Sequence, residues 1–351
     1  MFNLIQKWNF PSNNYGQILG IADSGIETFK GTPIKSLARE ICQNSLDAAL
    51  DNNEPTRIEF KAFEIDPRQI PDYTNLEDAL KRALDFWSQQ QSDKAKTFFK
   101  KALEVIHKPA ITCLRISDFN TSGLVGSREE YNSPWCNLTK SSGASDKSGS
   151  NGGSFGIGKF APYACSALRT VFYSTIDKDD VCASQGVSRL TSFKNKKNEI
   201  TQGTGFYGND KNSPMYKQYS LDPAYSRNAE NSGTDIYITA FTGDKGWQHQ
   251  MVASVLDGFL YAIYNGTLVV DVDGIIISKD TLADLMISHK EYFNEHADEY
   301  YQALTDEKLA RTFIKELTDD PEVIGKLTLR LIIMPSISRR VAMIRQTGMK
   351  I

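Results

Sequence analysis

Cysteine is scarce in this chain and is not arranged as it is in a disulfide framework. Among 351 residues there are five cysteines. They are odd in number, widely spaced and never part of a Cys-x-x-Cys pair: Cys42, Cys113, Cys136, Cys165 and Cys182. A secreted disulfide scaffold or a zinc ribbon would need paired or closely spaced cysteines. The pattern predicts reduced thiols in a cytoplasmic protein.

A net positive charge and a long apolar run are also missing. The chain has 40 Lys and Arg against 43 Asp and Glu, so nucleic-acid binding would require a local basic patch. No stretch approaches the ~20 apolar residues that span a bilayer. The first ten residues, MFNLIQKWNF, lack the cationic and apolar segments of a signal peptide. We therefore expect a soluble globular protein with no membrane partner.

Apolar spacing predicts both helices and strands along the chain. Helices are predicted at 36–50, 75–107, 159–167, 247–264 and 291–304. Strands are predicted at 56–65, 111–118, 169–175, 181–190, 234–241, around 268–277 and at 326–334. We place a domain boundary after residue 245, which gives a first domain of 1–245 and a second α/β segment of 246–351.

The segment 123–158 is irregular and rich in Ser, Gly, Asn and Lys, and its end permits several interpretations. Gly153, Gly158 and Lys159 fit the P-loop pattern G-x-x-x-x-G-K, but Phe160 stands where a hydroxyl should hold Mg²⁺. Ser154 lies in a G-x-S-x-G sequence, as in a nucleophile elbow. Both motifs need a preceding hydrophobic strand, and the fifteen residues before Gly152 are polar.

A third interpretation of the same segment is a phosphate-binding lid. Consecutive backbone N–H groups and a following helix N-terminus stabilise phosphate charge, and Lys159 adds a cation. A plain surface loop that precedes a helix is the alternative.

Glu40 and Asn44 are four residues apart in a predicted helix and therefore share one face. A carboxylate there can orient and deprotonate a water, while the amide oxygen can coordinate Mg²⁺. For an isolated pair, a solvated polar face is the simpler interpretation. Two later features favour a site: Asp118 closes a buried strand before the turn at Gly123, and the Gly233-Thr234 pair begins another strand.

The order of these motifs resembles the GHKL ATPase superfamily, which includes DNA gyrase B, the ninety-kilodalton heat-shock chaperone, histidine kinases and MutL. Its first motif, E-x-x-x-N-x-x-D-A, is matched in full by Glu40, Asn44, Asp47 and Ala48. The glycine motif and the Gly-Thr motif are matched as well. The second motif departs, because D-x-G-x-G would place a glycine two residues after Asp118, and the first glycine here is Gly123.

The resemblance implies a fold, a cofactor set and residue roles. The expected fold is α+β, a Bergerat-type two-layer sandwich with helices on one face of a mixed sheet, with 75–107 as an insertion and 119–158 as an ATP lid. Glu40 would be the general base, Asn44 the Mg²⁺ ligand and Asp118 the acceptor for the adenine amino group. Asp47 would orient the helix or a pocket water, Gly123 would form the turn, and Thr234 would support adenine through water. The phosphates of ATP would be held by Gly153, Ser154, Phe155, Gly156, Ile157, Gly158, Lys159 and Phe160.

The remaining expectations concern partners and output. No histidine precedes His107, which argues against a histidine kinase, whereas 246–351 resembles a truncated transducer domain whose Lys350 would reach the γ-phosphate. The expected function is an ATP-driven conformational or dimerisation switch in DNA processing or phage defence, acting on a protein partner or a missing C-terminal effector. The alternative is a non-catalytic ATP-binding scaffold or a chaperone-like module. The apolar N-terminal arm, residues 1–35, would either cross to a second subunit or pack on its own domain.

Overall fold

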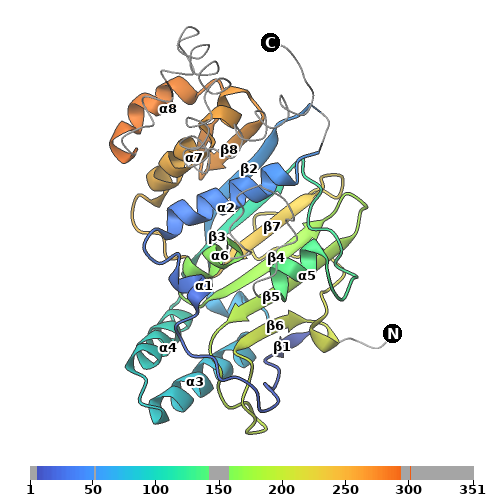
Figure 1. The fold of residues 1–351 in the computed structure, drawn as a ribbon, viewed down its shortest axis with the longest axis vertical. Helices are drawn as coiled ribbons and strands as arrows, with labels where there is room; N and C mark the ends of the chain where they lie inside the picture. The colour runs from blue at the N-terminus through green and yellow to red at the C-terminus, as the bar shows by residue number, and fades with distance from the viewer. Residues whose placement is uncertain (1–5, 51–52, 142–157, 294–300, 302–351) are drawn as a thin grey trace, which may run out of the picture.

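The computed structural model describes residues 6–50, 53–141, 158–293 and 301 (Figure 1). Its strands are β1 (Lys7–Asn9), β2 (Thr56–Ile65), β3 (Ile111–Phe119), β4 (Thr170–Ile176), β5 (Cys182–Arg189), β6 (Thr204–Gly208), β7 (Gly233–Ile238), β8 (Leu268–Val272) and β9 (Ile275–Ile277). Its α-helices are α1 (Ser24–Glu27), α2 (Pro33–Asp47), α3 (Tyr73–Gln89), α4 (Asp93–Ile106), α5 (Pro134–Thr139), α6 (Ala161–Ala164), α7 (Trp247–Tyr264) and α8 (Leu282–Ser288). The α+β class is confirmed.

All of these strands belong to one mixed sheet of nine strands. Their spatial order is β1-β6-β5-β4-β7-β3-β2-β8-β9. Neighbours are antiparallel except β2 and β8, which run parallel. Strands β3 and β7 lie next to each other at the centre. The end of β3 and the start of β7 therefore meet, which brings Asp118 close to Thr234.

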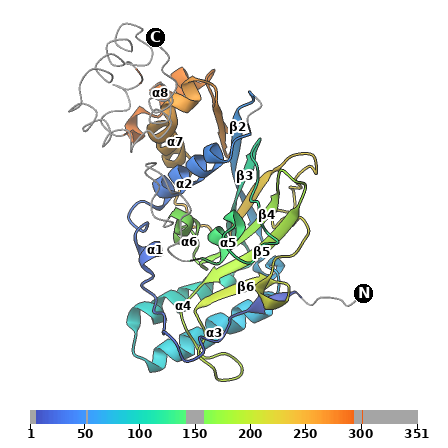
Figure 2. The same cartoon turned by 45° about the vertical axis from the view of Figure 1, so that its right-hand side comes forward.

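The two faces of the sheet bury different helices. In β2, Ile58 and Phe60 join the hydrophobic cluster that contains α2 and α7. Ile65 is at an odd-numbered position, so it points to the other face of the strand, and it joins the cluster that contains α3 and α4. Because alternate side chains of a strand point to opposite faces, the α3–α4 pair packs against the face opposite α2. The helices were expected on one face alone, and the inserted pair departs from that arrangement (Figure 2).

The predicted helical insertion 75–107 is two helices instead of one. The polar run 88–92 offers no apolar side chain to continue the buried stripe, and Gln91 adopts a left-handed φ of 55°. Helix α3 ends before this residue and α4 begins after it. Leu80 from α3 and Phe99 from α4 are fully buried in the shared cluster. The pair thus covers sheet surface that would otherwise be exposed.

The segment that follows residue 245 continues the same sheet. Helix α7 packs against α2, and β8 pairs with β2 from Thr56↔Leu268 to Phe60↔Val272. Strands β8 and β9 are joined by a hairpin at Asp273–Gly274, where both residues have positive φ. Described residues on both sides of the predicted boundary therefore share one sheet and one hydrophobic cluster. A second domain farther along, including the predicted strand 326–334, lies outside the described residues and stays a prediction.

The periodicity argument missed two short strands. Strand β6 reads Thr-Gly-Phe-Tyr-Gly, whose glycines interrupt any alternation, and β1 has only three residues. Trp8 of β1 is buried between Phe172 and Tyr207 and pairs with β6. Residues 7–9 of the N-terminal arm pair with β6, whereas residues 14–20 are exposed. Its residues 1–5 lie outside the described chain.

Candidate functional site

Helix α2 carries the predicted acid and amide together. Pro33 opens the helix, and Ile34, Leu37 and Ile41 form the stripe that faces the sheet. Glu40 and Asn44 lie beside this stripe, with Glu40 half-buried and Asn44 exposed. The expected helix and the shared face are both confirmed. Asp47, the last helical residue, is exposed at the end of the helix.

Gly158 lies directly against the carboxylate of Glu40. A Cβ added at Gly158 would overlap all three atoms of the Glu40 carboxyl group, so a side chain there would displace the carboxylate. Gly158 begins the short 3₁₀ helix η2 (Gly158–Phe160), which leads into α6. The Glu40 carboxylate on α2 thus lies at the start of η2, which is far from it in the sequence. The first backbone N–H groups of a helical segment have no partner within the helix.

Asp118 is held by three donors from three segments. Its Oδ1 accepts from the backbone N–H of Thr234 at 2.7 Å and from the hydroxyl of Thr121 at 2.9 Å. Its Oδ2 accepts from the hydroxyl of Ser45 on α2 at 3.0 Å. A carboxylate has about four lone-pair positions, so room for one more donor remains. The Asp118 side chain is half-buried.

A short bridge joins the end of α2 to the turn after β3. Ala49 pairs with Thr121, the N–H of Leu50 donates to Asn120, and the N–H of Ser122 donates to Ala48. Ala48 is the final residue of the first motif, so the motif and the strand-end acid are connected through their backbones. This bridge fixes the distance between the Asn44 end of the site and the Asp118 end.

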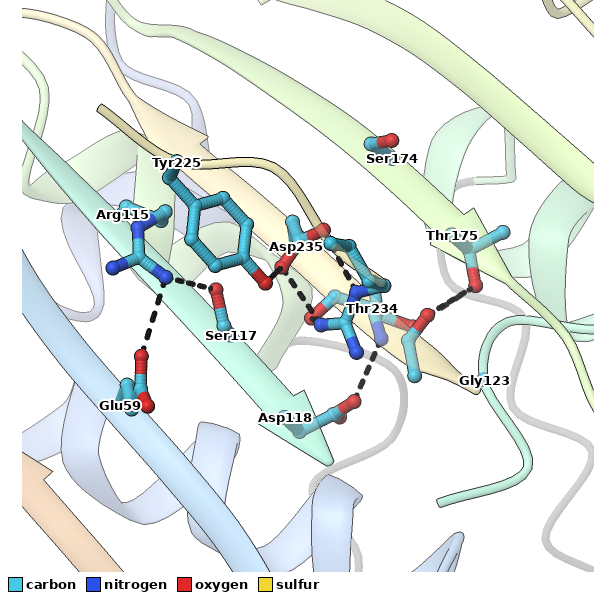
Figure 3. Close-up of polar contacts among 12 residues, drawn as sticks. Glu59, Arg115, Ser117, Asp118, Gly123, Ser174, Thr175, Tyr225, Thr234 and Asp235 are labelled. Atoms are coloured by element: carbon cyan, nitrogen blue, oxygen red, sulfur yellow. Dashed lines mark hydrogen bonds and ion pairs between the residues drawn. The ribbon is translucent and has the colours of Figure 1, made fainter. Parts of the chain in front are cut away.

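The Gly233-Thr234 pair fits closely beside Asp118. Gly233 has φ +148°, and a Cβ there would overlap the backbone oxygen of Asp118. The hydroxyl of Thr175 donates to the carbonyl of Gly233 at 2.9 Å and lies 3.4 Å from the hydroxyl of Thr234 (Figure 3). Gly123 also needs to be glycine, because its φ is +62° and a Cβ would meet the carbonyl of Ile176.

The opposite face of the sheet holds a polar network behind Asp118 (Figure 3). Arg227 pairs with Asp235, and the hydroxyl of Tyr225 donates to the same carboxylate. The guanidinium of Arg115 lies 3.6 Å from the centre of the Tyr225 ring and contacts Asp222. Sequence reasoning missed these residues, because no local pattern marks a loop arginine that is buried by a distant strand.

Lys159 and Phe160 occupy different environments. The Nζ of Lys159 donates to the carbonyl of Asn137 at 2.7 Å. Loss of solvent, followed by repulsion from Arg189, lowers the pKa of Lys159 to about 8. The Phe160 ring is buried against Gly25 and under the guanidinium of Arg189. Phe160 therefore belongs to the core, and only its backbone is available to a phosphate.

Burial also shapes the charge of Asp118. Loss of solvent raises its pKa above the usual range for an aspartate. The N–H of Thr234, the charge of Arg227 and the two hydroxyls act in the opposite direction. These neighbours thus offset only part of the effect of burial on the pKa of Asp118.

Several predicted site residues cannot be placed. Gly153, Ser154, Phe155, Gly156, Ile157 and Lys350 lie outside the described residues. Across the described ranges no three His, Cys, Asp or Glu side chains are clustered as metal ligands, and no helix there is long and apolar enough to cross a bilayer. The five cysteines form no disulfide with one another.

No protein-family model matches the chain, and no curated protein matches it at a significant level.

Proposed function

We propose that the chain binds ATP with Mg²⁺ and hydrolyses it, as a member of the GHKL superfamily. One observation carries the proposal: the carboxylate of Glu40 lies against Gly158, and Asp118 on the neighbouring strand end accepts from both Ser45 and Thr234. These contacts between residues distant along the chain support the proposal.

The adenine end would be read by Asp118. Its three hydrogen bonds come from neutral donors and leave one acceptor position, which suits the amino group of adenine. Guanine presents a carbonyl oxygen at the equivalent position and would face the carboxylate unfavourably. The site should therefore prefer ATP to GTP.

The phosphate end would be formed by the N–H groups of η2 and by α2. Asn44 is exposed, and its amide oxygen is a ligand that Mg²⁺ accepts together with water and phosphate oxygens. A site with few protein ligands is normal for Mg²⁺ bound to a nucleotide, so the residues present fit the ion. The ion would neutralise phosphate charge. Glu40 would orient the attacking water and take its proton.

Hydrolysis would then drive a switch. Helix α2 packs against α7, which leads toward the C-terminal part of the chain, so a movement of α2 around the nucleotide would reach that region. A gated homodimer, a protein partner or a further effector segment would receive the signal. DNA processing and phage defence are the settings that we propose for it.

The decisive experiment compares Glu40→Gln with wild type in nucleotide binding and turnover. A general base acts in the transition state, so kcat should fall by ~10²–10⁴-fold while ATP affinity stays within a few-fold. Glu104→Gln, on the exposed side of α4, is the matched control and should leave both unchanged. Wild-type protein that binds ATP without turnover would indicate the scaffold function. Protein that binds no adenine nucleotide would refute the proposal.

A further inference from the structure

Arg227 lies across the sheet from the Asp118 carboxylate and is almost completely buried. Its side chain is 2% exposed and that of its partner Asp235 is 3% exposed. The two are joined by parallel hydrogen bonds, from Nε to Oδ2 at 2.9 Å and from Nη2 to Oδ1 at 2.7 Å. Such a bidentate pair fixes the plane and position of the guanidinium.

The same guanidinium clamps the backbone that contacts Asp118. Its Nη2 donates to the carbonyl of Thr234 at 3.2 Å, and its Nη1 donates to that of Ser232 at 3.5 Å. Gly233 lies between these two residues, and a Cβ there would meet both Arg227 and Asp118. The N–H of Thr234 is thereby aimed at Oδ1 of Asp118.

Further contacts hold Arg227 itself. Its guanidinium lies 4.7 Å from the centre of the Phe119 ring, next to Asp118 in β3. Arg57 on β2 lies 3.9 Å from the same ring and pairs with Glu59. The hydroxyl of Tyr225 donates to Asp235 at 3.1 Å. This clamp is built into the sheet and does not depend on the nucleotide.

We propose that Arg227 is a positioning residue for the nucleotide site, which holds the backbone around Gly233 so that the N–H of Thr234 meets Asp118, the base-reading acceptor. The inference rests on the proposed function in its choice of ligand. Its geometric part does not, because the clamp acts on Asp118 in the free protein.

Charge supports this role. Arg227 is the cation whose attraction lowers the pKa of Asp118 against the larger effect of burial. The other groups that contact the carboxylate, Thr234, Thr121 and Ser45, are neutral. On the neighbouring strands, Asp235 of β7 pairs with Arg227, and Arg57 pairs with Glu59 on β2. Removing the guanidinium should therefore let the proton stay on Asp118 to a higher pH.

The experiment measures the Asp118 carboxyl directly and nucleotide binding separately. The full chain, labelled with ¹³C at aspartate carboxyl carbons, is titrated by NMR, with Asp118→Asn to assign the signal. The variant Arg227→Gln/Asp235→Asn removes the buried pair together, so that no charge is left without a partner. Arg227→Lys is the conservative variant, and Arg68→Gln/Asp66→Asn, which removes an exposed ion pair elsewhere, is the matched control that leaves Arg227 in place.

The titration midpoint of Asp118 should rise in the Arg227→Gln/Asp235→Asn double variant, rise less in Arg227→Lys, and stay unchanged in the control Arg68→Gln/Asp66→Asn. The affinity for ADP should fall roughly ten-fold or more in the double variant and decline at a higher pH than in wild type, as expected when one buried hydrogen bond is lost. Circular dichroism and thermal unfolding check that each variant is folded.

An unchanged Asp118 midpoint in a folded double variant would overturn the inference, whatever the nucleotide result. If wild type binds no ADP, the proposed function fails, and the midpoint still decides the role of Arg227. If the double variant binds ADP with the wild-type pH profile, Arg227 has only a structural role.

Discussion

The contact between Gly158 and Glu40 makes Gly158→Ala a severe test of the site. A methyl group at this position would overlap the Glu40 carboxyl group, whereas ordinary van der Waals contact begins at 3.4 Å. The carboxylate must therefore retreat by about 1 Å or more. Displacements of that size cost ~10²-fold in rate when a catalytic group must meet a reacting atom. We expect kcat to fall by about 10²–10³-fold.

Stability should change little, because Gly158 begins a helical segment and alanine is at least as compatible with a helix. Gly258→Ala in α7 is the control, since a Cβ there meets nothing within 4 Å. Steady-state phosphate release and thermal unfolding are measured for wild type and four variants. These are Gly158→Ala, Gly258→Ala, Glu40→Ala and the double variant Gly158→Ala/Glu40→Ala. The double variant should be no slower than Glu40→Ala alone, because the methyl group acts only through that carboxylate. Full activity in Gly158→Ala, or additive losses in the double variant, would refute the reasoning.

Three further predictions test other parts of the molecule. Asp118→Asn should weaken ATP binding by roughly 5- to 150-fold, because a donor amide replaces one acceptor oxygen. Calorimetry with ATP and with GTP measures this loss and the loss of preference for ATP. The pKa of Lys159 is lowered to about 8, so ATP binding near pH 8.5 should be accompanied by protonation of its amine. Calorimetry in buffers of different ionisation enthalpy measures this proton uptake, and Lys159→Met should abolish it. The Nδ1 of His249 lies 3.1 Å from the Nε2 of His289, and burial followed by repulsion from His249 lowers the pKa of His289. The neutral form of His289 is thus favoured in the folded state, so the free energy of unfolding should decrease as pH falls through about 6.5 and below. Urea titrations measure this free energy at each pH, and its pH dependence should be weaker in His289→Gln.

Local pattern was sufficient for the elements that carry the motifs. The spacing of Leu37 and Ile41 indicated α2, and the helical repeat then placed Glu40 and Asn44 on one face. A buried strand that ends in an acid indicated Asp118. These features depend on neighbours within a few residues, which is the range over which sequence periodicity carries information.

The partners of those motif residues could not be predicted in the same way. Ser45, Thr175 and Arg227 contact the site only because strands and loops distant in sequence are adjacent in the sheet. A hydroxyl beside Asn44 or an arginine in a loop has no distinguishing local context. The side of the sheet chosen by the α3–α4 pair is likewise set by packing, since its apolar stripes would suit either face.

The sheet order also determines when this protein can fold during synthesis. Trp8 pairs with Tyr207 and Thr56 with Leu268, so β1 meets β6, and β2 its second neighbour β8, only after about 200 further residues. At ~5–20 residues per second, that delay is on the order of 10–40 s. Asp118 likewise lacks the Thr234 donor until β7 has left the ribosome. During this interval apolar strands stay unpaired, and such edges are prone to aggregate. We therefore expect the nascent chain to depend on chaperones, and nucleotide to bind only once translation has passed β7.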